Sequence, residues 1–187
     1  RLYDRCRSNN QKTRARHGSP PRSINSRCKV AIMDAVQRFT QAADTAGFPV
    51  AAEQFPEGTR TAKDAAAAVG CELAQIVKSL VFVHGENPYL VLASGKNRVD
   101  ESLVAEAMDV ESLSIASPDQ VRKVTGFAIG GTPPFGHLTL IPTILDKDLF
   151  TYETVWAAAG TPDTCFPISP QDLEKITSAI VADVAAA

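Results

Sequence analysis

The chain has 187 residues, of which 44% are hydrophobic and 21% charged, a composition that fits one globular domain with a substantial core. No apolar run approaches the ~20 residues that a membrane-spanning helix needs, so we expect no membrane partner. The first residues also lack the apolar segment of a secretory signal, so we expect a cytoplasmic protein. The four cysteines form no CxxC pair and the three histidines are scattered, so we expect no metal site and no cofactor.

Charge is unevenly distributed along the chain. Residues 1–32 carry nine Lys and Arg side chains against one acid, Asp4, so a formal net charge of −2 leaves −10 on residues 33–187. An acidic body argues against broad binding to duplex nucleic acid, and we expect no DNA partner. Because residues 1–32 have few large apolar side chains, we expect a disordered basic leader upstream of a native start near Met33. The alternative is a basic arm that binds RNA phosphates. We place the folded domain at residues 33–187.

The first predicted elements are two short helices with an extended segment between them. Asp34 can cap a helix that Gly47 ends, and residues 48–55 then read as extended. Thr61 has Asp64 three residues further on, the pattern of a capping box, which predicts an alanine-rich helix from there.

A hairpin is predicted next. Residues 79–83 and 89–93 are compact apolar runs joined by the turn sequence Gly-Glu-Asn-Pro. Asp100 then caps a predicted helix, and residues 113–115 form a short predicted strand.

The last third of the chain mixes helices and strands. Ser117, followed by Pro and with Gln120 at N3, predicts a helix start, and the alternation over residues 138–145 predicts a strand interrupted by a proline. Residues 154–160 fit either a strand or a loop, and a final helix is predicted over residues 170–184. The sum is an α+β fold with mostly antiparallel neighbouring strands.

The most distinctive run is Gly-Gly-Thr-Pro-Pro-Phe-Gly-His at residues 130–137. Its glycines and prolines exclude an ordinary helix or central strand and predict a stiff loop whose backbone groups are accessible to a ligand. Such a loop suits a wall that holds a small polar ligand, or it is a tight connection between two strands. His137, at its end, is a candidate for ligand contact.

Lys78 is the candidate charged group. It stands at the start of an apolar strand, where its ammonium could bind a phosphate or polarise a carbonyl. The alternative is a lysine with a buried stem and a solvated ammonium. Lys96, Arg98 and Asp100 form either a local ion network or the polar rim of a cleft. The chain has no GxSxG and no P-loop, so neither a hydrolase triad nor a phosphate-binding loop is predicted.

Taken together, these stretches resemble the YbaK/EbsC family, which includes the editing domain of bacterial prolyl-tRNA synthetases and its free-standing relatives. The resemblance runs from Val36 to Val184, and it rests on the order and spacing of its motifs. These motifs are Thr61-Ala62, Ile76-Val77-Lys78-Ser79-Leu80, Arg98-Val99-Asp100, Thr125-Gly126, the run from Gly130 to Gly136, and a small-residue run closing at Gly160.

The resemblance implies a fold and an activity. The fold is a mixed, mostly antiparallel, barrel-like sheet flanked by helices. The activity is hydrolysis of misacylated tRNA, usually proline tRNA that carries a wrong small amino acid, in which the tRNA's own 2′-hydroxyl assists. The implied partners are the acceptor end of an aminoacyl-tRNA and a prolyl-tRNA synthetase.

The resemblance also implies site residues. We hypothesise that Lys78 anchors the terminal adenosine phosphate or the ester, and that backbone groups of Gly130 and Gly131 orient the ester and the water. The remaining expected substrate-binding residues are Thr61, Asp100, Thr132, Pro133, Pro134, Phe135, Gly136, His137 and Gly160.

The amino acid to be removed is less defined by the sequence. Phe48, Phe55, Ile129 and Pro133 are candidate pocket walls. Pro-Pro-Phe-Gly at residues 133–136 departs from the Ser-Pro-Leu-Gly of the cysteine-removing branch, so a small aliphatic or hydroxylated amino acid is expected. Two alternatives compete with editing: a non-catalytic nucleic-acid-binding module that uses the basic leader, and a small-molecule-binding protein that uses the same pocket without hydrolysis.

Overall fold

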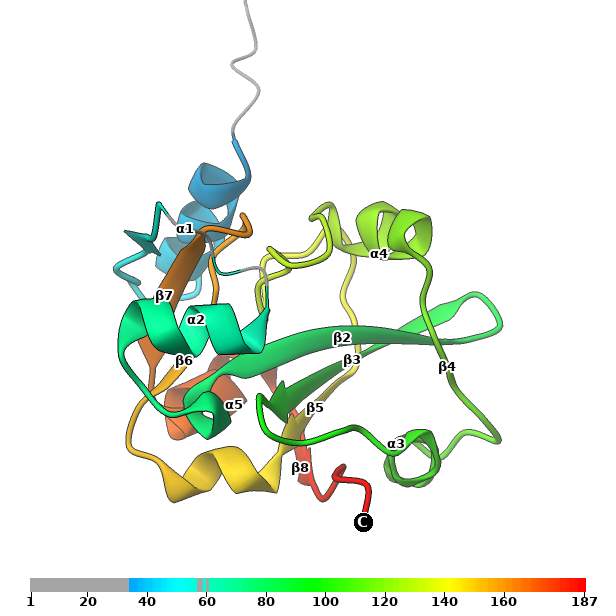
Figure 1. Ribbon diagram of the computed structural model, residues 1–187. Coiled ribbons are helices and arrows are strands. Elements are labelled where there is room, and N and C mark those ends of the chain that lie inside the picture. Colours follow the sequence, from blue (N-terminus) through cyan, green and yellow to red (C-terminus); the bar gives the residue numbers. More distant parts are fainter. Residues whose placement is uncertain (1–33, 57–58, 60) are drawn as a thin grey trace, which may run out of the picture. The chain divides into compact units, whose positions relative to one another are not determined.

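The computed structural model describes residues 34–56, 59 and 61–187 (Figure 1). The helices are α1 (Ala35–Thr45), α2 (Ala62–Val69), α3 (Glu101–Ala107), α4 (Pro118–Thr125) and α5 (Pro170–Thr177), with 3-10 turns η1 (Leu73–Gln75) and η2 (Lys147–Thr151). The strands are β1 (Glu53–Gln54), β2 (Val77–His84), β3 (Asn87–Ser94), β4 (Ser114–Ile115), β5 (Thr143–Asp146), β6 (Val155–Ala158), β7 (Thr164–Ile168) and β8 (Ile180–Ala182). None of these helices is long and apolar enough to cross a membrane. The predicted leader, with the start near Met33, lies outside the described residues and stays a prediction.

The predicted helix starts are confirmed by their caps. Asp34, Thr61 and Ser117 each accept a hydrogen bond from the N3 amide of their helix in a capping box. Asp100 and Ser169 cap α3 and α5 in the same way with their side-chain oxygens. Each cap satisfies an amide that the helix leaves unpaired and contributes about 1 kcal/mol. Local sequence therefore determines where these helices begin.

Two sheets carry the fold. The larger has the order β4-β2-β3-β5-β8 and the smaller the order β1-β7-β6. The pairs β3–β5 and β5–β8 are parallel, and the other pairs are antiparallel, so the predicted α+β fold with mostly antiparallel strands is confirmed. Within the described residues neither sheet closes on itself, so "barrel-like" is only a loose description of it.

The hairpin of β2 and β3 lies at the centre of the domain and is covered on both faces. On one face Leu90 packs with Phe39 of α1 and Leu173 of α5, all fully buried. On the other face Val91 packs with Val104 of α3. Neighbouring residues of a strand point to opposite faces, and here each face has its own apolar layer. The hairpin is therefore a rigid support for the residues at its ends.

The two sheets meet at the start of β2. Ile76 and Trp156 form an isolated parallel bridge there, which joins the entry of β2 to β6. Ala65 and Ala66 of α2 pack over Ile76, and Figure 1 shows α2 beside β6 and the beginning of β2. The joint brings together segments that are far apart in the sequence.

Two predicted elements are wrong in extent. The final helix ends at Ser178, which has a left-handed backbone with φ 51°, and β8 then pairs in parallel with β5. The β-branched pair Ile180 and Val181 fits this strand, and the pairing overrides the helical spacing of the sequence. The strand predicted over residues 138–145 starts only at Thr143, because Pro142 has no amide to donate to a ladder.

Candidate active site

A cavity of about 240 Å³ lies at the joint of the two sheets. Its walls come from α2 and the loop before it, the start of β2, the glycine-proline loop, β6 and β7. The apolar lining residues are Ala62, Ala65, Ile76, Val77, Leu80, Ile129, Trp156 and Ala158. The others are Thr59, Thr61, Lys78, Ser79, Gly130, Thr132 and Cys165. The cavity is thus mostly apolar with a few polar groups, as is usual for a site that orients a small ligand.

Lys78 is the charged side chain among the described residues that line this cavity. It pairs with Ala93 across the β2–β3 hairpin and is half-buried. Its Nζ donates a hydrogen bond to the carbonyl oxygen of Asn97. Burial lowers the pKa of Lys78 below the usual lysine value, and the nearby carboxylate of Asp146 opposes that shift. An ammonium has three donors, so hydrogen-bonding capacity remains for a ligand.

The first half of the glycine-proline loop lies against the cavity. Gly130 and Thr132 line it, and the Thr132 hydroxyl donates to Ala128 O at 3.1 Å. The Gly131 amide donates to the same carbonyl at 3.1 Å, so it is occupied, whereas the Gly130 amide has no partner among the described residues. A Cβ on Gly131 would lie 2.7 Å from backbone atoms of Thr161, which requires glycine there. Gly131 therefore anchors the loop, and Gly130 is the loop glycine that lines the cavity.

The second half of the loop lies in the core. Pro133, Pro134 and Phe135 are buried, and the Phe135 ring centroid lies 4.9 Å from that of Phe39. The stretch Pro134–His137 lines a separate hollow beside α1. The structure therefore does not bring Pro133, Pro134, Phe135, Gly136 or His137 to the cavity of Lys78.

His137 is tied to its own loop. Its Nε2 lies 2.8 Å from the Pro133 carbonyl oxygen, and its ring packs edge-on to Phe127. Burial lowers the pKa of His137, the hydrogen bond to Pro133 raises it, and the guanidinium of Arg38 lowers it. These contacts hold the loop together on the side away from the cavity.

Some of the other predicted site residues line the cavity and some do not. Thr61 lines the cavity and also caps α2, with its hydroxyl donating to Asp64 at 2.7 Å. Asp100 accepts the amides of Ser102 and Leu103 as the cap of α3 and is not part of the lining. Gly160 is not part of it either, and its backbone lies against that of Ala35. Of the candidate walls, Ile129 lines the cavity, while Phe48 lines a different hollow.

Sequence reasoning missed Thr59, Ile76, Trp156 and Cys165 as lining residues. The bridge between Ile76 and Trp156 depends on how the sheets meet, which no local motif records. The signal available was the single tryptophan of the chain, within a segment that fitted either a strand or a loop. Burial raises the pKa of the Cys165 thiol, so it stays protonated near neutral pH and is a wall rather than a nucleophile. Across the described residues, no group of three or more His, Cys, Asp and Glu is placed to hold a metal ion.

Comparison with known proteins shows that the segment carrying this cavity matches a protein family. The family model described as "Aminoacyl-tRNA editing domain" matches residues 56–176, which include every lining residue. A solved structure of a candidate trans-editing enzyme for prolyl tRNA synthetase superimposes with a TM-score of 0.79. It is 46% identical to this chain, and the match covers 84% of this chain and 100% of the other.

Two relatives found by sequence similarity also match this chain. The uncharacterised protein YwhH of Bacillus subtilis is 29% identical over 125 residues, 66% of this chain and 79% of YwhH. The proline–tRNA ligase of Limosilactobacillus fermentum is 34% identical over 97 residues, 49% of this chain but 17% of the ligase. The match to the ligase thus concerns one stretch of a much longer enzyme. The chain belongs to the aminoacyl-tRNA editing domain family.

Proposed function

We propose that this protein is a trans-editing hydrolase that deacylates misacylated tRNA, with proline tRNA carrying a wrong small amino acid as its substrate. One observation carries the proposal: half-buried Lys78 and Gly130, whose amide has no partner among the described residues, line the same small, mostly apolar cavity. That cavity lies wholly within the segment that matches the editing-domain family. The substrate would enter by its acceptor end, delivered free or by a prolyl-tRNA synthetase.

The proposed reaction needs no covalent intermediate because an aminoacyl ester is already activated. Water attacks the carbonyl carbon, the bond from this carbon to the ribose oxygen breaks, and the proton of the water passes to that oxygen. Negative charge develops on the carbonyl oxygen during the attack. The Lys78 ammonium or the Gly130 amide would stabilise it, and one such donor is commonly worth ~3–4 kcal/mol. The 2′-hydroxyl of the tRNA would assist in orienting the water.

Size would set the choice of amino acid. A cavity of about 240 Å³ holds roughly eight waters at ~30 Å³ each, which is room for a small aminoacyl group and part of the ribose. Trp156 and Ile76, which are joined by a bridge between the sheets, both line the cavity. A synthetase pocket separates substrates that differ by one methylene by only ~1–3 kcal/mol, so a second site that selects by size has a clear use.

The test is release of amino acid from a panel of proline tRNAs charged with alanine, serine, threonine, cysteine or proline. The chain is tested from residue 1 and from Met33, as wild type and as Lys78→Ala. Lys175→Ala is the matched control, because Lys175 is an exposed lysine on α5. We expect turnover of a small non-cognate amino acid that survives removal of residues 1–32 and the control substitution, and is lost in Lys78→Ala. Binding of these tRNAs without turnover by the wild type would overturn the proposal.

A further inference from the structure

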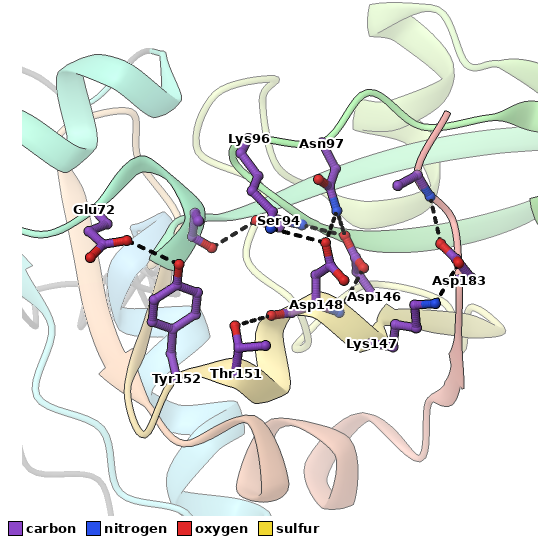
Figure 2. A network of polar contacts seen from close by, with 12 residues as sticks. Glu72, Ser94, Lys96, Asn97, Asp146, Lys147, Asp148, Thr151, Tyr152 and Asp183 are labelled. Atoms are coloured by element: carbon purple, nitrogen blue, oxygen red, sulfur yellow. Dashed lines mark hydrogen bonds and ion pairs between the residues drawn. The ribbon is translucent and has the colours of Figure 1, made fainter. Parts of the chain in front are cut away.

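The turn that accepts the hydrogen bond of Lys78 is held by a buried carboxylate. Figure 2 shows this carboxylate, Asp146, beside Ser94 and Asn97. Asp146, at the end of β5, is fully buried. Its Oδ2 accepts hydrogen bonds from the Ser94 amide at 2.9 Å and from Asn97 Nδ2 at 2.8 Å. Its Oδ1 accepts the Asp148 amide at 3.0 Å. The carboxylate is therefore satisfied by three donors and fixes residues 94–97 against the end of β5.

The same turn is also held from the side of η1. The Ser94 hydroxyl donates to the Ala74 carbonyl at 2.8 Å, and the Gly95 amide donates to the Ile76 carbonyl at 2.7 Å. A Cβ on Gly95 would lie 2.1 Å from the Leu73 carbonyl oxygen, so the backbones touch directly. The turn is thus fixed from two sides.

The turn presents the carbonyl of Asn97 to the ammonium of Lys78. Lys78 Nζ donates to it, while the ion pairs of the described residues are Lys96–Asp148, Lys147–Asp183 and Lys175–Asp172. Lys78 is thus held by a neutral oxygen, and the Asp146 carboxylate acts on its charge without a direct ion pair. A direct ion pair would neutralise the ammonium, whereas a carbonyl holds its position and leaves its charge available.

Resting on the proposed function, we propose that Asp146 and Asn97 are positioning residues for the deacylation. The carboxylate of Asp146 orients the Asn97 side chain and the turn, and the Asn97 carbonyl aims the Lys78 ammonium into the cavity. Lys96 and Asp148 extend this network toward solvent, where they pair at 3.2 Å, and Asn97 Nδ2 also reaches Asp148 Oδ2 at 3.0 Å. Neither Asp146 nor Asn97 lines the cavity, so both act through Lys78.

Kinetics are the first half of the test. The variants are Asp146→Asn and Asn97→Ala. The matched control is Asp183→Asn, which removes a carboxylate from the exposed ion pair Lys147–Asp183, also drawn in Figure 2. We expect the single-turnover rate at saturating protein to fall about tenfold or more in Asp146→Asn and in Asn97→Ala, because misplacement of a catalytic group is costly. The KM for the charged tRNA should change less than about twofold, since no contact to tRNA is removed. Asp183→Asn should match the wild type.

Titration of Lys78 is the second half and needs no activity. In protein labelled with ¹³C at lysine Cε, the Lys78 signal is assigned by its loss in Lys78→Met. Asp146 is the charged group that acts on Lys78, while Lys96 and Asp148 pair with each other. Removing the Asp146 carboxylate should lower the pKa of Lys78 further and move the alkaline limb of the pH–rate profile to lower pH. Asp183→Asn should move neither.

The outcomes separate the two proposals. If the wild type does not deacylate any tRNA, the proposed function fails, and the Lys78 titration alone decides the positioning role. An unchanged Lys78 pKa in Asp146→Asn, or an unchanged rate in an active protein, overturns the inference. If Asp146→Asn does not fold, Asn97→Ala decides by its rate, because it leaves Asp146 with the amides of Ser94 and Asp148 as donors.

Discussion

The wall of the cavity that carries Lys78 and the wall that carries Gly130 are stabilised by different kinds of interaction. Behind Lys78 lies a buried polar network centred on Asp146, in which each hydrogen bond has a direction. Behind the second half of the glycine-proline loop lies apolar packing, in which the rings of Phe39, Phe135 and Phe166 contact one another. Directional bonds suit a wall that must aim one charge, and dense apolar packing suits a wall that must hold a backbone shape.

This difference predicts different failures. A substitution behind Lys78 should change the rate and its pH dependence. A substitution behind Gly130 should lower the free energy of unfolding, and affect the rate only where the loop itself moves. The variants below test that division.

The largest expected effect on stability is that of Phe135→Ala. The side chain is 9% exposed and packs against two aromatic rings, so its removal should lower the free energy of unfolding by ~3–5 kcal/mol. Urea unfolding followed by the fluorescence of Trp156 measures it. A loss under ~1 kcal/mol would show that the loop wall does not depend on this packing.

Gly131→Ala should have the next largest effect and should change both properties. Its Cβ would meet Thr161 backbone at 2.7 Å, which a side-chain rotation cannot relieve. We expect a loss of ~1–3 kcal/mol in the free energy of unfolding and a lower deacylation rate, since Gly130 must move with its neighbour. Unfolding and single-turnover assays on the same preparation check this. Full activity in a destabilised variant would argue against a role for the Gly130 amide.

His137 should make the loop wall sensitive to acid. Its pKa is lower in the folded protein than the ordinary value of 6.5, so the unfolded chain binds the proton first as the pH falls. Stability from neutral His137 is therefore complete above ~6.5 and is lost as the pH falls from there through the folded pKa. Thermal unfolding of wild type and His137→Gln between pH 7.5 and 5 measures this. The wild type should lose more stability on acidification, and equal losses would contradict the assignment.

The exposed pair Lys147–Asp183 should give the smallest effect. Its oxygen–nitrogen distance is 2.5 Å, but both side chains are about half exposed, so water and salt screen the interaction. Lys147→Ala should leave the unfolding midpoint nearly unchanged, and the remaining difference should disappear in 1 M salt. A clear destabilisation would mean that the polar network depends on its solvent-exposed end.

The sequence predicted the parts of the fold that depend on local chemistry. The caps at Asp34, Thr61 and Ser117 are short-range hydrogen-bond patterns, and each helix begins as predicted. Strands set by pairing were predicted less well. β7 was not predicted, and its Pro167 is tolerated because β1 pairs only with Thr164 and Cys165.

The candidate site likewise has residues that local motifs predicted and residues that only the pairing of strands brings together. Lys78, Gly130, Thr61 and Thr132 line one cavity, as their motifs led us to expect. Trp156 enters through a bridge between sheets, and the function of Asp146 as support becomes visible only when β5 lies beside the end of β3. Contacts of this kind depend on which strands pair in the fold. They join segments that are far apart in the sequence, so no local motif predicts them.

The most direct test of the account is the single-turnover rate of Lys78→Met on the best misacylated proline tRNA of the panel. Methionine keeps the apolar stem and removes the ammonium, so folding should be retained and only the charge lost. We expect the rate to fall about 10²–10³-fold with an unchanged unfolding midpoint. A rate within about twofold of the wild type would contradict the central claim that the Lys78 charge drives deacylation.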